Sequence, residues 1–160
     1  MTNPVPALFT ILAGVTSALQ ATPGYGAPDS SASTPVYDGP MIGQDSPEQY
    51  VCVGWNPNGS DEAGRLATEA STMGTRADKL EAGTFEVTIV ARDGDGLTAS
   101  ARTTVQSILE DVSAAAYSYT DTSFAAFWCR QESVVLRQNQ DQYGTTVIAE
   151  ATFAYTCQLV

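Results

Sequence analysis

The stretch TFEVTIVARDGDGLTASARTTVQSILEDVSAAAYSYT, residues 84–120, contains the transition that decides the fold of this chain. Phe85, Val87 and Ile89 occupy every second position, which is the period of a strand with one face against a core. The run Asp-Gly-Asp-Gly at residues 93–96 interrupts this pattern. From Thr98 onward apolar residues recur every three or four positions, which predicts a helix of about five turns. Its apolar face consists of Ala101, Val105, Ile108, Leu109, Val112, Ala115, Ala116 and Tyr119.

The segments before residue 84 predict a helix, two short strands and two stretches without regular structure. Residues 1–20 predict an amphipathic helix, because Leu8, Leu12 and Leu19 lie on one helical face. The Pro-, Gly- and Ser-rich residues 21–35 indicate an exposed linker. Strands are expected at 35–42 and 49–55, on either side of a turn at 43–47. Residues 56–83 show no clear apolar period and predict a long polar loop, the first place to seek a partner contact.

The last third of the chain predicts two more strands, at residues 126–138 and 145–159, joined by a polar turn. The order of elements is then helix, strand, strand, loop, strand, helix, strand, strand. We therefore expect residues 1–160 to form a single α+β domain. It would be a two-layer sandwich in which two helices cover one face of a mixed or mostly antiparallel sheet of four to five strands.

The charge balance argues against several classes of function. Eighteen Asp and Glu against seven Lys and Arg give a formal net charge of −11 over 160 residues. Such a chain opposes binding to nucleic acid or to an anionic membrane, where affinity comes from cationic side chains. The sequence contains no His, and so lacks the commonest general base and metal ligand.

The three cysteines, Cys52, Cys129 and Cys157, form no C-x-x-C pair and lie in strand-like runs. We expect them to behave as small buried hydrophobic residues in a reducing cytoplasm, with one disulfide between strands as the alternative. The apolar start of the chain resembles a secretory signal, but it has no basic residue before its apolar run. The helix interpretation is therefore preferred over a signal, and the run is too short to span a bilayer.

No catalytic or cofactor site is predicted. The sequence lacks the G-x-S-x-G motif and a phosphate-binding Gly-rich loop with its Lys, and the adjacent Glu110 and Asp111 would point in different directions on a helix. Asp93 and Asp95 resemble the start of a calcium loop, but Leu97 and Thr104 stand where an EF-hand needs oxygen ligands. We therefore expect a turn here, and no metal, organic cofactor or enzymatic activity.

Four aromatic residues could form a platform that stacks on a flat ligand. They are Trp55, Phe124, Phe127 and Trp128. Because they lie within apolar strand-like segments, we expect them to belong to the core or to a subunit interface.

Several short motifs in order resemble the tail terminators of long-tailed (siphovirus-type) phages of actinobacteria. They are Pro-Val-Tyr-Asp-Gly-Pro at 35–40, Tyr-Val-Cys-Val-Gly-Trp at 50–55, the strand at 84–90, the Asp-Gly-Asp break, the Ala-rich helix around Ile-Leu-Glu-Asp-Val at 108–112, and Phe-Ala-Tyr-Thr-Cys at 153–157. Together they cover most of residues 34–160. The loop at 56–83 departs from the family pattern.

The resemblance implies a structural virion protein in the tail and neck region, assembled in the host cytoplasm. Such a protein would form a homo-hexameric ring that caps the tail tube, stops its elongation and joins it to the head. Its partners would be the tail tube protein and a head-closure (stopper) or connector protein. Viral DNA would pass through the lumen without specific binding, which suits an acidic chain, and no membrane would be involved.

Two alternatives remain from the sequence. The first is another ring protein of the same virus, such as a head-closure or tail-tube subunit, because it would share the acidic composition and the mixture of strands and long loops. The second is a secreted, non-catalytic binding domain, which the apolar start and the Trp and Tyr content would suit.

Overall fold

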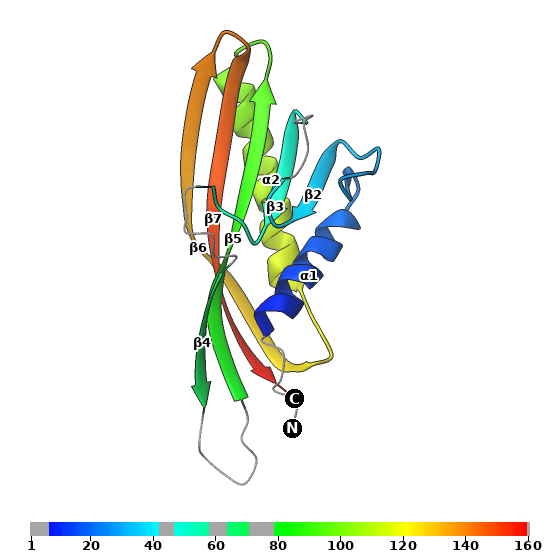
Figure 1. Cartoon of the computed structure of the whole chain (residues 1–160), viewed down its shortest axis with the longest axis vertical. Helices are drawn as coiled ribbons and strands as arrows, with labels where there is room; N and C mark the ends of the chain where they lie inside the picture. Colours follow the sequence, from blue (N-terminus) through cyan, green and yellow to red (C-terminus); the bar gives the residue numbers. More distant parts are fainter. Residues whose placement is uncertain (1–6, 42–46, 58–63, 71–78, 160) are drawn as a thin grey trace.

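The computed structural model describes residues 7–41, 47–57, 64–70 and 79–159. Within these ranges the chain forms helices α1 (Ala7–Gln20) and α2 (Thr98–Ser118) together with seven strands (Figure 1). The strands are β1 (Tyr25–Gly26), β2 (Thr34–Asp38), β3 (Gln49–Val53), β4 (Gly64–Ala70), β5 (Lys79–Asp93), β6 (Phe124–Asp141) and β7 (Gly144–Leu159).

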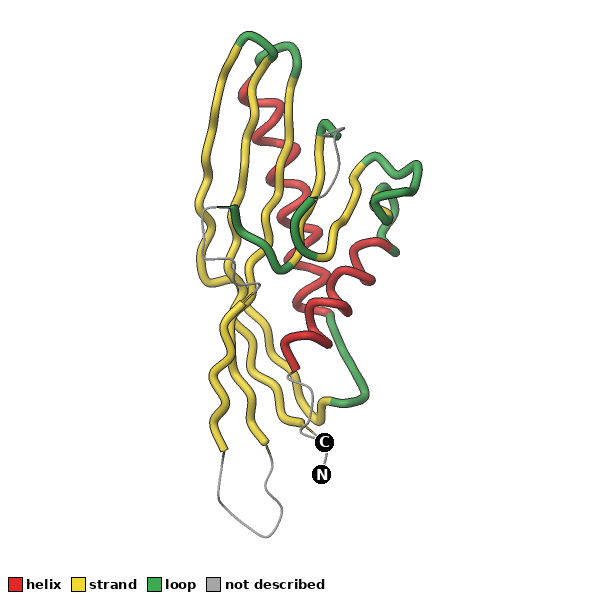
Figure 2. The backbone as a smooth tube through the Cα atoms, viewed as in Figure 1, coloured by secondary structure: helices red, strands yellow, loops and turns green. Residues whose placement is uncertain are grey.

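The strands form one mixed sheet in the order β1-β2-β3-β5-β7-β6, and β4 pairs with the first half of β5. β1, β2 and β3 run parallel to one another, whereas the other pairings are antiparallel. The two helices lie on the same side of this sheet (Figure 2). The predicted two-layer α+β architecture is therefore confirmed, with more strands than expected because β1 and β4 were not predicted.

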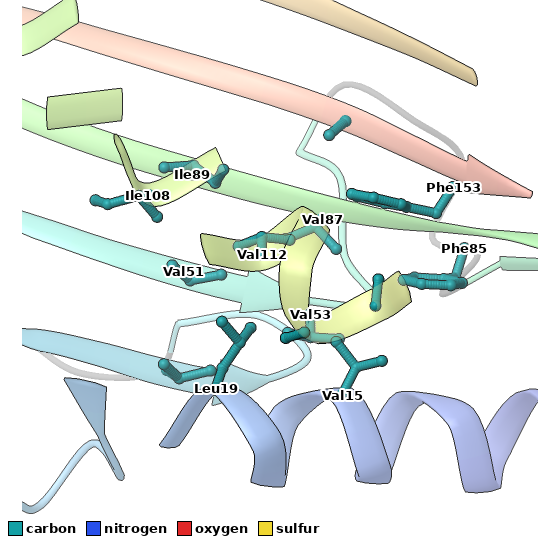
Figure 3. Packing of buried hydrophobic residues seen from close by; sticks show 14 of the residues in the cluster. Val15, Leu19, Val51, Val53, Phe85, Val87, Ile89, Ile108, Val112 and Phe153 are labelled. Carbon is teal, nitrogen blue, oxygen red and sulfur yellow. The ribbon is translucent and has the colours of Figure 1, made fainter. Parts of the chain in front are cut away.

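The core lies between the helices and the inner face of the sheet. Phe85 of β5 and Phe153 of β7 stack there with ring centroids 5.3 Å apart, and both are fully buried. Val87, Ile89 and the alternate residues of β7 continue the same buried face, as the period-two pattern predicts. Figure 3 shows these side chains meeting those of α1 and α2.

Helix α1 forms where the apolar period predicts it, and Ile11, Val15 and Leu19 are fully buried. The carboxylate of Glu81, which is 4% exposed, accepts hydrogen bonds from the backbone N–H of Leu8 at 3.2 Å and from the Tyr155 hydroxyl at 3.1 Å. An anion at the first turn of a helix is favourable because the unpaired N–H groups and the helix dipole are positive there. The first six residues of the predicted helix, 1–6, lie outside the described residues.

Helix α2 covers the centre of the sheet with the predicted face. Ile108 is 3% exposed, whereas the neighbouring Leu109 is half-buried at the rim of the core. Asp111 is half-buried and accepts a hydrogen bond from the Tyr25 hydroxyl at 2.6 Å. Burial and this carboxylate raise the pKa of Tyr25.

The predicted loop at 56–83 is wrong in part, because it contains β4 and the first residues of β5. β4 lacks the β-branched alternation typical of strands, and its backbone pairs with β5 from Gly64–Phe85 to Ala70–Lys79. Pairing with β5 thus places residues 64–70 in a strand although their sequence has little strand propensity. The predicted linker at 21–35 likewise contains β1 and the start of β2.

Other strand boundaries differ by a few residues at the ends. The strands predicted at 35–42 and 49–55 are β2 and β3, which end at Asp38 and Val53, and most of the expected turn at 43–47 lies outside the described residues. The two C-terminal strands, β6 and β7, begin and end close to their predicted limits and form a long hairpin. In the described part of the chain, neither helix combines the length and apolar character needed to cross a membrane.

Candidate assembly surface

The sheet face that points away from the helices is called the outer face here. β6 is the last strand of the sheet, so one of its edges has no strand partner in the described chain. The register of β6 against β7 shifts between Gln131 and Ser133. The shift is a β-bulge that adds one residue to β6. The side chains of β6 on the outer face are therefore those of even-numbered residues before the bulge and of odd-numbered residues after it.

As a result Trp128, Arg130, Val135 and Arg137 all project from the outer face and form one row, called the β6 stripe. Their partners on β7 are Thr156, Ala154, Glu150 and Ile148, which alternate along one face of that strand. Trp128 is 62% exposed and Val135 is 47% exposed. Aromatic residues and Arg are enriched in protein interfaces, so this row is suited to a protein partner.

The two arginines of the β6 stripe are held differently. Arg137 Nε lies 3.0 Å from Oε1 of Glu150, whose side chain is only 6% exposed. Arg130 lies 3.4 Å from Glu132, and with 78% of its side chain exposed this ion pair is weak. Arg130 therefore remains available to a partner, while Arg137 is oriented by Glu150.

A hollow of about 270 Å³ lies next to the stripe between β6 and β7. Trp128 and Arg130 line it on one side, and Ala154 and Thr156 line it on the other. A space of this size is enough for a side chain from a partner, so the stripe offers a pocket as well as a row of contacts.

The opposite end of the sheet is acidic. Asp29, between β1 and β2, and Asp38, at the end of β2, are both exposed and are called the acidic edge here. Residues 1–64 contain six Asp and Glu and no Lys or Arg, so all seven basic residues follow in the sequence. At the other end of the sheet, β6 and β7 carry Arg130 and Arg137 together with Glu132, Asp141 and Glu150.

A third feature is a projecting hairpin, called the arm, formed by β4 and residues 79–85 of β5. The free end of the arm extends past the N-terminal end of α1 (Figure 1), whereas Glu81 and Phe85 of its β5 part are buried and residues 80–85 also pair with β7. β4 pairs with β5 alone, so its outer edge has no strand partner in the described chain. Such edges are the usual site of strand addition by another chain.

The four aromatic residues considered as a platform do not come together. Phe124 and Phe127 stack with centroids 5.9 Å apart on the helix side, and Tyr119 packs edge-on against both. Trp128 projects from the outer face instead, because consecutive strand residues alternate in direction. The expected assignment to core or interface fits this arrangement better than a stacking platform.

Trp55 lies apart from the other three, in a small cluster on the outer face. It packs with Tyr50, Cys52 and Val90, and its backbone carbonyl accepts a hydrogen bond from Thr88 Oγ1 at 2.7 Å. This cluster covers the part of the outer face near β3. The β6 stripe lies at the other side of β7 and remains exposed.

The Asp-Gly-Asp-Gly break is a turn between β5 and α2, as expected. Asp93 Oδ1 accepts hydrogen bonds from the backbone N–H groups of Asp95 at 2.9 Å and Leu97 at 3.4 Å. A hydrogen bond from the Ser100 side chain, helped by these backbone bonds, lowers the pKa of Asp93. Among the described residues no group of three or more acidic or Cys side chains could hold a metal ion.

The cysteines are free thiols in this structure, as the preferred interpretation predicts. Cys52 and Cys157 are buried, whereas Cys129 is half-buried. Burial raises the thiol pKa of Cys52 and Cys129 to about 12 and that of Cys157 to about 11. Raised pKa values leave little thiolate near neutral pH, so these groups are poor nucleophiles.

Sequence reasoning missed the β6 stripe. Trp128 and Arg130 have even numbers and Val135 and Arg137 have odd numbers, so simple alternation would place the two pairs on opposite faces. The bulge between them places all four on one face. The available signal was the distribution of charge, because two of the few basic residues fall in one predicted strand.

The carboxylates of Glu110 and Asp111 serve local contacts: Glu110 accepts a hydrogen bond from Gln106 at 3.1 Å, and Asp111 accepts one from Tyr25.

Comparison of the sequence with models of known protein families finds no match, and comparison with curated proteins finds none either.

Proposed function

We propose that this protein is a structural subunit of a phage tail, which assembles into a ring that caps the tail tube and provides the surface for joining to the head. The observation that carries this proposal is the arm, whose free end extends past the N-terminal end of α1 and whose β4 edge has no strand partner in the described chain (Figure 1). The resemblance of the motifs at 34–160 to tail terminators supplies the identity of the assembly.

The arm supports a role in assembly because it is costly to order in isolation. Fixing the backbone of each residue costs roughly 1–2 kcal/mol, and β4 recovers this through one strand neighbour only. A partner that pairs with the β4 edge would supply the missing backbone hydrogen bonds. In the proposed ring that partner is the end of the tail tube.

The proposal is tested with purified tube protein from the same virus, polymerised with and without this protein. We expect tubes that are shorter in its presence and that carry one ring at an end in negative-stain electron micrographs. A tail-tube subunit would instead be incorporated along the tubes and lengthen them. Unchanged tube lengths and bare tube ends would contradict the proposal.

A second variant tests the role of the arm. Replacing residues 65–79 with a short Gly-Ser linker removes β4 and its connection to β5, while both helices and the other strands remain. We expect the same far-ultraviolet circular dichroism apart from a small loss of strand signal, together with loss of capping. If the variant caps tubes as well as the wild type does, the contact surface lies elsewhere.

A further inference from the structure

The carboxylate of Glu81 joins the arm to the first turn of α1. Glu81 lies in the β5 part of the arm, between Thr68 of β4 and Cys157 of β7 in the strand register, and it is 4% exposed. Its Oε1 atom accepts hydrogen bonds from the backbone N–H of Leu8 at 3.2 Å and from the Tyr155 hydroxyl at 3.1 Å. Burying a carboxylate is costly without such donors, so the docking of α1 and the charge of Glu81 depend on each other.

The negative charge of Glu81 matters as much as its hydrogen bonds. The first N–H groups of a helix have no partner inside it, and together with the helix dipole they favour a nearby anion. The first turn of α1 has no acidic residue of its own, and no Asp or Glu precedes Asp29 in the sequence. A protonated Glu81 could still accept both hydrogen bonds at Oε1, but it would lack the charge that strengthens them.

We propose that Glu81 is a pH-sensitive latch, which holds the first turn of α1 against the arm while its carboxylate is ionised and loosens that turn when the carboxylate is protonated. Docking of the turn therefore weakens as the pH falls through the titration of Glu81. Leu8 and Ile11, at the start of α1, are buried in the same core as Phe85 of the arm, so loosening uncovers apolar side chains at this junction. The latch belongs to the free chain and does not rest on the proposed function.

The groups that face Glu81 from β6 and β7 do not titrate in the acidic range. They are Tyr155 and Cys157 on β7, and Cys129, which lies opposite Tyr155 on β6. Burial raises the pKa of all three groups. They therefore keep their protons at and below neutral pH, where the latch operates.

The remaining elements around Glu81 supply no other acid. Residues Ala7–Gln20 of α1 include no Asp, Glu, Lys or Arg. β4 places Thr68, which does not titrate, opposite Glu81 in the register. Lys79 precedes Glu81 by two residues on β5, and a lysine is cationic throughout the acidic range.

One other carboxylate is connected to α1 and serves as the matched control. Asp121 accepts a hydrogen bond from the Tyr119 hydroxyl at 3.4 Å, and this hydroxyl also donates to the backbone carbonyl of Thr10 at 3.1 Å. Hydrogen bonds from Ser123 lower the pKa of Asp121. Asp121→Asn removes the same charge as Glu81→Gln, but it leaves the donors to Glu81 in place.

The experiment measures backbone hydrogen exchange of the full chain by NMR at several values between about pH 7 and 4, where carboxylates titrate. Each rate is divided by that of an unstructured chain at the same pH, which gives a protection factor. In the wild type we expect protection at Leu8 and Ile11 to fall about fivefold to tenfold with pH, and to fall less at Leu19, at the other end of α1. The carboxyl chemical shift of Glu81 should titrate with the same midpoint.

The two variants separate Glu81 from the other acidic groups. Glu81→Gln keeps the Oε1 acceptor without the charge, so its protection at Leu8 should already be low at neutral pH and should not fall further. Asp121→Asn should keep the wild-type pH dependence. Circular dichroism checks that both variants are folded.

Three results would overturn the inference. They are protection at Leu8 that does not change with pH in the wild type, a wild-type pH dependence in Glu81→Gln, and different midpoints for the Glu81 carboxyl and the loss of protection. Loss of the dependence in Asp121→Asn alone would assign it to that carboxylate instead and also refute the latch. Tube capping is measured separately, so none of these results decides the proposed function.

Discussion

Truncation of Ile108 to Ala tests how α2 packs on the sheet. Ile108 is 3% exposed, so Ile108→Ala removes three buried carbon atoms at ~0.8 kcal/mol each, or about 2.4 kcal/mol in transfer free energy. If about 40 Å³ of the vacated space stays unfilled, the cavity adds about 1 kcal/mol. We therefore expect the free energy of unfolding to fall by about 3–4 kcal/mol.

The matched control is Leu109→Ala, one residue further along the same helix. Leu109 is half-buried at the rim of the core, so solvent can fill the space and the loss should be about 1 kcal/mol. Urea unfolding followed by tryptophan fluorescence measures both. With a slope of about 2 kcal/mol per molar urea, the midpoint should fall by about 1.5–2 M for Ile108→Ala and by about 0.5 M for Leu109→Ala. Equal losses at the two positions, or a loss below about 1 kcal/mol at Ile108, would refute the packing of α2 described above.

Three further predictions follow from local features. Gly144→Ala should cost more stability in urea unfolding than Gly39→Ala. Both glycines have positive φ, but of the two only a Cβ at residue 144 would clash with a backbone atom, the carbonyl oxygen of Asp93, and similar losses would contradict this reasoning. The free energy of unfolding should fall between about pH 9 and 12, because burial raises the pKa of Cys52 and of Tyr119 to about 12 in the folded state. The unfolded chain loses these protons at lower pH than the folded chain, so rising pH favours unfolding. An unchanged midpoint of urea unfolding over this range would exclude the effect. Dialysis against EDTA should leave the melting temperature unchanged, whereas a loss that Ca²⁺ alone restores would indicate a cation site at Asp93.

Most regular elements of the fold could be predicted from the sequence, because their apolar periods are strong. The face of α1 with Leu12 and Leu19, the strand around Val87 and the hairpin strands β6 and β7 all follow such periods. β4 could not be predicted, since its residues have little strand propensity and its order depends on pairing with β5.

The candidate assembly surface could be predicted from the sequence less well than the fold could. The sequence by itself determined the acidic balance, the absence of basic residues before Arg65 and the two-layer class, because composition and period are local properties of the chain. Only the tertiary structure decided that the bulge at Gln131–Ser133 places Trp128 and Val135 on one face. It also decided that β6 and β2 lie toward opposite ends of the sheet. Strand order and register arise from contacts between distant segments, and a shift of one residue moves every following side chain to the other face.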